Sequence, residues 1–308
     1  MDTGRKGKRA FPNDSSELAM SLDRCYLTVL QYPPDLTERQ RTLALSHALA
    51  VDDYSASMLQ KLAPPAVVKT CASDAAAEAV GRLRDLGIDA AAITREQIER
   101  FSVRTEAKRL LPAIGAPRAM YAIEPLRPRL ATVSSIVMDD VAMIVFGRVE
   151  KTKSMVDPAP TIGSDLSGLD DSHAIASGAA AHASMNDATP LGVPRSRTSA
   201  DAYLIDLYTG GGECVRIDSD KCSFDVLGDE RGLTDRENAA KLMERLRGEL
   251  TRGVVDVGFD SFKPPGDVLV QRSRAVGGTS INSSDNRPAF DFYSAWRVAL
   301  YAMLRKRA

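Results

Sequence analysis

Residues 66–93 read AVVKTCASDAAAEAVGRLRDLGIDAAAI, and this stretch decides the fold expected for the first part of the chain. The β-forming run at 66–70 is followed by Ser73, a residue type that caps helices. Apolar residues then recur at helical spacing as far as Gly87, which stands where a glycine commonly ends a helix. A second β-forming run follows at 88–93. The stretch therefore predicts a strand, a helix and a second strand.

The flanking residues extend this stretch into a module over residues 21–101. The run at 25–30 predicts a further strand. Two Thr-x-x-Gln capping boxes predict helix starts, and Asp53 caps a short helix. These boxes pair Thr37 with Gln40 and Thr94 with Gln97. The predicted order of strand, helix, helix, strand, helix, strand gives a two-layer α/β sandwich, with helices on one face of a three-stranded sheet.

From Leu45 to Ile93 the chain resembles the C-terminal domain of the bacterial ribosomal stalk protein L7/L12. The likeness lies in the strand, the serine-initiated helix with a small-residue face, the glycine turn and the final strand. The resemblance implies the same two-layer fold. Members of that family bind translational GTPases through a turn between their first two helices, which bears glycine and lysine. The corresponding residues 50–57 contain neither residue type, and Asp52 and Asp53 stand there.

Two segments are expected to contain little regular structure, namely a tail and a connector with at most one or two helical turns before Pro112. Residues 1–20 are basic near their start and contain no apolar core of a secretory signal, which predicts a disordered tail. Residues 102–129 combine six basic residues with four prolines. This composition predicts a basic, proline-containing connector between two modules.

Residues 130–308 are expected to form a β-rich α+β module. Antiparallel hairpins are predicted within 131–149 and within 202–217. The segment 151–199 is rich in small residues, contains no aromatic residue and is predicted to be a disordered insert. Helices are expected to close the module, the last of them over 290–304 with an aromatic stripe. This order of elements is loosely similar to that of a pleckstrin-homology domain.

The composition argues against several classes of function. Forty basic and 41 acidic side chains leave a formal net charge of −1, without the positive excess that nucleic-acid binding uses. No apolar run approaches the roughly 20 residues of a transmembrane helix. The four cysteines show no CxxC spacing. Since no export signal is recognised, they are expected to be reduced thiols of a cytoplasmic protein.

Few residues suggest catalysis. Of three histidines, His47 alone lies outside the predicted insert. The sequence contains no Ser-His-Asp arrangement, HExxH motif or phosphate-binding loop. Asp206, Asp218 and Asp220 flank the second predicted hairpin and are the candidate catalytic residues of a metal-dependent enzyme. Some nucleases carry a carboxylate two residues before a lysine. Lys221 does not complete this pattern, because the residue two positions before it is Ser219.

These observations favour a non-catalytic role in protein–protein interaction or regulation, with an unidentified protein partner in the bacterial cytoplasm. No cofactor or metal is expected in that case. The alternative is a metal-dependent hydrolase or nuclease that uses the acidic residues near the 203–226 hairpin.

Overall fold

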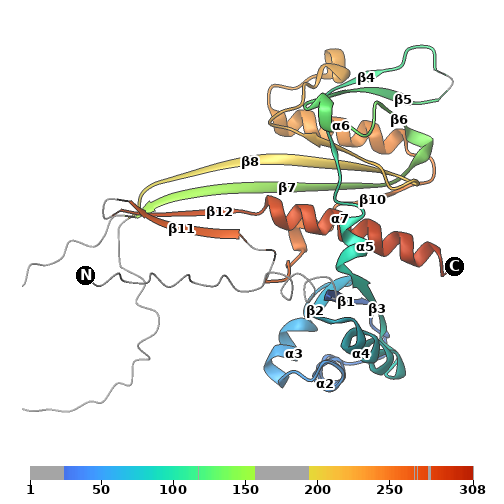
Figure 1. Ribbon diagram of the computed structural model, residues 1–308, viewed down its shortest axis with the longest axis vertical. Helices are drawn as coiled ribbons and strands as arrows, with labels where there is room; N and C mark the ends of the chain where they lie inside the picture. Colours follow the sequence, from blue (N-terminus) through green and yellow to red (C-terminus); the bar gives the residue numbers. More distant parts are fainter. Residues whose placement is uncertain are drawn as a thin grey trace, which may run out of the picture. The chain divides into compact units, whose positions relative to one another are not determined.

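The computed structural model describes residues 24–116, 118–156, 194–266, 268, 270–276 and 279–307. The predicted tail over 1–20 and the centre of the predicted insert over 151–199 lie outside these residues. The chain divides into two compact units, one of residues 1–149, 202–269 and 287–308 and one of residues 150–201 and 270–286. Helices and sheets both occur, which confirms the predicted α+β class (Figure 1).

The first sheet has the order β2-β1-β3, and both outer strands pair antiparallel with the central β1. Both predicted capping boxes are confirmed, because Thr37 and Thr94 each accept from the backbone of the glutamine three residues on. Ser73 is not the cap it was predicted to be, since it is the first helical residue and Ala72 holds the cap position. The elements are β1 (Arg24–Gln31), α2 (Glu38–Leu49), α3 (Asp53–Leu59), β2 (Ala66–Ala72), α4 (Ser73–Asp85), β3 (Asp89–Thr94) and α5 (Arg95–Glu99).

The two faces of this sheet have different covers. Leu27 on one face packs with Leu45 of α2 and Leu83 of α4 in a single buried cluster. The opposite face carries Tyr26 and Thr28 and is covered by α7 (Arg287–Arg305), the last helix of the chain. The two-layer prediction is therefore incomplete, because a third layer comes from residues far along the sequence.

The second sheet of the larger unit has the order β7-β8-β9-β4-β5-β6, and β10 pairs with β7. Most pairs are antiparallel, while β10 with β7 and β4 with β9 are parallel. The strands are β4 (Thr105–Pro112), β5 (Met120–Pro125), β6 (Ser135–Val137), β7 (Val141–Val156), β8 (Pro194–Thr209), β9 (Cys214–Asp218) and β10 (Val254–Asp256).

Residues 102–129 are not the strandless connector that their composition predicted, because β4 and β5 lie there. Thr105 and Ala107 are buried with a more exposed residue between them, and burial resumes at Leu110 after a shift in the strand register between Ala107 and Arg109. The prolines are compatible with strands, since Pro112 and Pro125 are each the last residue of one.

The hairpin prediction within 202–217 is confirmed, since β8 pairs antiparallel with β9. The prediction within 131–149 is wrong. There β6 pairs with β5, and the short helix η2 (Met138–Asp140) leads from β6 into β7. At the ends of the predicted insert, β7 continues to Val156 and β8 begins at Pro194. In the smaller unit, β11 (Val270–Val276) pairs with β12 (Thr279–Asp285), and β12 pairs with residues 151–156 of β7.

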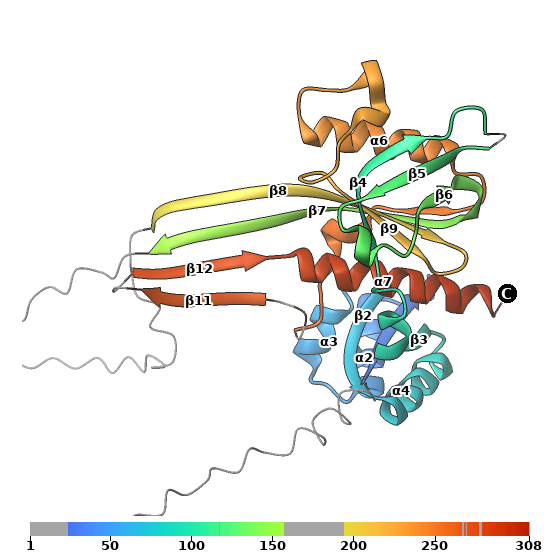
Figure 2. The ribbon, with the colours of Figure 1, turned by 45° about the horizontal axis from the view of Figure 1, so that its top comes forward.

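Both faces of the second sheet are covered by helices within the larger unit (Figure 2). Ile205 and Leu207 of β8 belong to a cluster with α6 (Asp235–Glu249). Leu204 and Tyr208 belong to a different cluster with α7. Since successive residues of a strand point to opposite faces, Asp206 lies on the α7 face of the sheet. The helix α7 is thus shared by both sheets.

Candidate functional site

Polar residues of α7 meet charged residues of β8 and β9 in regular steps along the helix. Arg287 donates to Asp218 at 2.7 Å, and Ser294 donates to Asp206 at 2.6 Å. Between them, Asp291 accepts from Arg216. Positions 287, 291 and 294 follow the helical repeat and so face the same side. Two of the three predicted site residues, Asp206 and Asp218, are therefore bound by side chains of α7.

Asp206 is fully buried and is bound on both oxygens. Arg216 donates to Oδ1 and Oδ2 at 2.7 Å each, and Nε of Arg104 lies 3.4 Å from Oδ2. Burial opposes ionisation of this carboxyl, but the charge and hydrogen bonds of Arg216, with the charge of Arg104, hold its pKa below the ordinary value. The carboxylate is a compensated structural charge.

Asp218 and Asp220 stand apart from that pair. Asp218 lies 3.1 Å from Nζ of Lys221 and also binds Arg287, so its pKa is lowered although burial acts in the opposite direction. Asp220 is exposed, and its partial burial together with the nearby charge of Asp218 raises its pKa. The three carboxylates do not converge on one point.

The alternative of a metal-dependent hydrolase therefore lacks a site in the hairpin region. Arginine and lysine side chains occupy the positions around Asp206 and Asp218 that a metal ion would need. Across the residues that the structure describes, no group of three or more His, Cys, Asp or Glu side chains could hold a metal. His47 is exposed on the last turn of α2.

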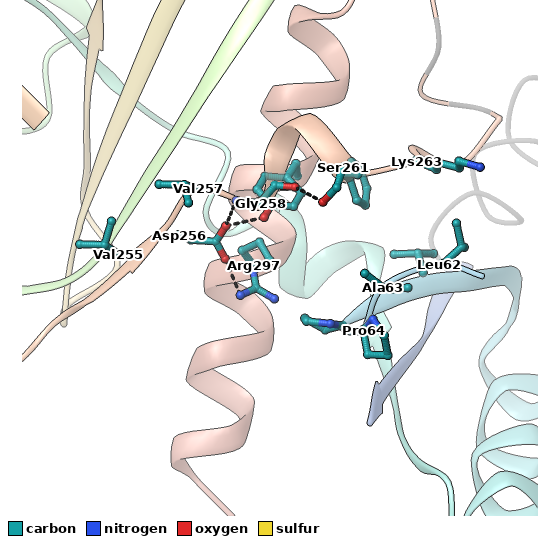
Figure 3. Close-up of a pocket in the computed structure, with 15 residues that line it drawn as sticks. Leu62, Ala63, Pro64, Val255, Asp256, Val257, Gly258, Ser261, Lys263 and Arg297 are labelled. Carbon is teal, nitrogen blue, oxygen red and sulfur yellow. Dashed lines mark hydrogen bonds and ion pairs between the residues drawn. The ribbon is translucent and has the colours of Figure 1, made fainter. Parts of the chain in front are cut away.

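A cavity of about 280 Å³ lies elsewhere in the larger unit, where the first sheet and α7 come together. Figure 3 shows Asp256 and Arg297 on one side of it and Leu62, Ala63 and Pro64 on the other. Asp256 ends β10, while Arg297 belongs to α7. The cavity thus joins three distant parts of the sequence.

Asp256 is the buried centre of the polar wall. Its Oδ1 accepts from the hydroxyl of Tyr293 and, at 2.9 Å, from the backbone N–H of Gly258. Its Oδ2 forms an ion pair with Arg297. Burial and the adjacent carboxylate raise the pKa of Tyr293, so this phenol stays protonated and acts as a donor. The negative charge of Asp256 is therefore compensated by Arg297, and both of its oxygens accept or pair with a neighbour.

Arg297 has donor capacity left over. Its side chain is 19% exposed, its guanidinium lies 5.7 Å from the ring centre of Trp296, and its Nε is buried without a hydrogen-bond partner. Lys263 also lines the cavity, is exposed, and forms no hydrogen bond or ion pair with another described residue. Since Arg297 is paired with Asp256, Lys263 carries the one unpaired charge among the described residues that line the cavity, so the cavity can receive one anionic group.

A second cavity, of about 410 Å³, shares Leu62, Val67 and Lys263 with the first. We call the two cavities together the groove. Asp256 is the one carboxylate among the described residues that line it, so the groove offers no ligand set for a metal. The second cavity is lined further by Met58, Leu59, Val68, Lys69, Thr70, Pro264, Pro265 and Gly266.

No sequence pattern points to this groove. Asp256 follows an apolar run and Arg297 lies within the predicted closing helix, so the pattern around each residue indicates a structural element. An arginine inside an aromatic stripe was the one available hint, because a buried cation needs a partner.

No protein-family model, characterised protein or solved structure matches the chain. Among the residues with a described placement, no helix combines the length and the apolar character that a membrane crossing needs.

Proposed function

We propose that this protein is a non-catalytic interaction protein that binds an extended segment of a partner protein in the groove. The segment is apolar and carries one carboxylate, from an acidic side chain or from a chain end. The carboxylate pairs with Arg297 and Lys263, while apolar side chains fill the second cavity. This proposal deepens the role in protein–protein interaction or regulation that the composition favours.

The observation that carries the proposal is an apolar groove with one unpaired cation in its lining, because Arg297 is paired with Asp256 while Lys263 has no partner among the described residues. Its walls include Leu62, Val67 and Phe262, which provide burial for apolar side chains. Lys263 and the buried Nε of Arg297 have no hydrogen-bond partner among the described residues. Lys263 is exposed and solvated in the free protein, and an incoming carboxylate would form a charge-assisted hydrogen bond with it.

The lining residues support binding over catalysis. None of the described residues that line the two cavities is a cysteine or a histidine. The hydroxyl of Ser261 donates to the backbone oxygen of Gly258 at 2.9 Å, and no base lies beside it in the lining. A nucleophile without a neighbouring base is weak at neutral pH.

The resemblance of residues 45–93 to the C-terminal domain of the stalk protein family agrees with a protein partner, since that family binds other proteins. In this chain the turn between α2 and α3 carries Asp52 and Asp53 in place of glycine and lysine. The groove lies at the other end of α3, where Met58 and Leu59 form part of the wall. We therefore propose a partner site different from that turn.

The test is a peptide-display selection on the full chain, followed by affinity measurements on synthetic peptides. We expect apolar peptides with one carboxylate to be enriched. A charge-assisted hydrogen bond contributes about 1.5–3 kcal/mol, so Arg297→Gln should weaken binding about 10- to 100-fold. Lys263→Glu should weaken it further by repulsion.

Lys61→Glu provides the matched control. Lys61 is exposed, is the chain neighbour of Leu62 in the groove wall, does not line either cavity, and undergoes the same change of charge. Its binding should stay within about twofold of the wild type, because exposed charges interact weakly. Equal losses in Lys61→Glu and Lys263→Glu, or selection of peptides without a carboxylate, would refute the proposal.

A further inference from the structure

Two cysteines stand directly opposite each other in the first sheet. Cys25 of β1 and Cys71 of β2 are partners in the antiparallel register, and the next pair on the same face is Leu27 with Lys69. Both thiols are free. Residues directly opposite in an antiparallel pair project to the same face, so the two side chains are neighbours.

The strand geometry fits a disulfide without movement of the backbone. Opposite residues of antiparallel strands have Cα atoms about 4.5 or 5.5 Å apart, depending on their place in the hydrogen-bond ladder. Disulfides span Cα distances of about 4.4–6.8 Å. Both values fall within this range. A bulge in the pairing lies beyond Leu27, so the Cys25–Cys71 pair itself is in regular register.

The two thiols differ in access. Cys25 is 2% exposed, while Cys71 is half-buried near the start of α4. Burial raises the pKa of Cys71, the Lys69 ammonium acts against this rise, and Cys25 adds to it. The influence of Cys25 agrees with its position across the strand pair. A small reagent therefore reaches Cys71 first, and Cys25 lies behind it.

We propose that Cys25 and Cys71 form a thiol-modification site that takes up a reversible disulfide by exchange with a low-molecular-weight disulfide. The Cys71 thiolate attacks one sulfur of the reagent, so that its S–S bond breaks and one small thiol leaves. The Cys25 thiolate then attacks the Cys71 sulfur, forms the Cys25–Cys71 bond and releases the second small thiol. Both cysteines are oxidised, the reagent is reduced, and the two protons leave on the released thiols.

The experiment treats the full chain with oxidised glutathione and analyses it without reduction. The protein should lose two hydrogen atoms in mass, and trypsin should release Cys25–Arg39 linked to Thr70–Arg82. The disulfide closes a long loop, so the melting temperature should rise by roughly 5–10 °C and return on addition of dithiothreitol.

Three variants separate the steps. Cys71→Ala should give neither the linked peptides nor the rise in melting temperature. Cys25→Ala should stop at a glutathione adduct on Cys71, because the second thiolate is absent. Cys222→Ala removes a different buried free thiol and should behave as the wild type.

Several results would overturn the proposal. Wild-type protein that stays unreacted, or that keeps glutathione on Cys71 without forming the linked peptides, would show that the pair does not exchange. A linked peptide containing Cys214 or Cys222 would assign the chemistry elsewhere. If Cys25→Ala does not fold, the comparison of Cys71→Ala with Cys222→Ala still tests whether Cys71 is needed for the linked peptides and for the rise in melting temperature.

Discussion

Asp206 and Asp256 are both buried carboxylates held by an arginine and a hydroxyl, yet they differ in what lies beside them. Around Asp206, Arg216 is 5% exposed and Arg104 is 11% exposed, and Ser294 completes the set. Around Asp256, Arg297 is 19% exposed and borders a cavity. Arg104 and Arg216 also border a cavity, of about 250 Å³ and lined mostly by polar residues, but Asp206 itself does not line it. Asp256, in contrast, is part of the wall of the groove.

The comparison shows that composition does not separate a structural ion pair from a binding site. Both groups contain an aspartate, an arginine and a hydroxyl donor. The distinguishing feature is whether the carboxylate itself lines a cavity. Asp256 lines the cavity beside Arg297, whereas Asp206 does not line the cavity that Arg104 and Arg216 border.

The largest effect is expected for Asp206→Ala. Removing Asp206 leaves Asp291 as the remaining carboxylate partner of both Arg216 and Arg104, and breaking a buried ion pair in this way typically costs about 3–5 kcal/mol. Urea denaturation should report this loss of unfolding free energy. Glu213→Ala, an exposed change in the same hairpin, should stay within about 0.5 kcal/mol. A loss below about 1 kcal/mol for Asp206→Ala would show that Asp206 is not more important for stability than Asp256.

A smaller loss is expected for Asp256→Ala. The Tyr293 hydroxyl and the Gly258 N–H lose their acceptor, but water in the cavity can reach Arg297. We expect a loss of about 1–2 kcal/mol in the same urea measurement. If the loss equals that of Asp206→Ala, water does not solvate the unpaired Arg297 through the cavity, and the groove is closed in solution.

The third prediction concerns pH. The folded-state pKa values of Asp206 and Asp218 lie below the ordinary value, so their contribution to stability is present above about pH 4. It is lost as the pH falls through the folded-state values. Asp218→Asn removes one of these titrations and should make the fall in unfolding free energy below pH 4 shallower. An unchanged slope would show that the Asp218 carboxylate does not contribute.

The smallest effect is expected for Asp220→Asn. Its raised pKa means that the folded chain disfavours the charged form, so loss of the charge at pH 7 should be neutral or slightly stabilising. The change should remain within about 0.5 kcal/mol, because the side chain is exposed. A large loss of unfolding free energy in Asp220→Asn would contradict this prediction and would indicate that the Asp220 carboxylate stabilises the fold.

The sequence predicted the elements of the first sheet because their signals are local. The boxes at Thr37 and Thr94 each depend on a glutamine three residues away. The hairpin of β8 and β9 likewise joins neighbouring segments, so its three glycines were enough to find it.

The features that were missed depend on contacts between distant segments. Arg104 was read as part of a connector because its partners, Asp206 and Asp291, lie beyond the insert. The groove needs residues near 62, 256 and 297 together. No spacing rule joins such positions, and only the packing of α7 between two sheets brings them into contact.

The hydrogen bond from Trp296 to Thr28 joins residues 268 positions apart in the chain. A ribosome adds about 5–20 residues each second, so β1 leaves it some tens of seconds before α7 is made. During that interval Tyr26 and Val67 have no helix to cover them, although the opposite face of the sheet can already pack on α2 and α4. The nascent chain therefore presents an unfinished apolar surface that chaperones are suited to shield until translation reaches α7.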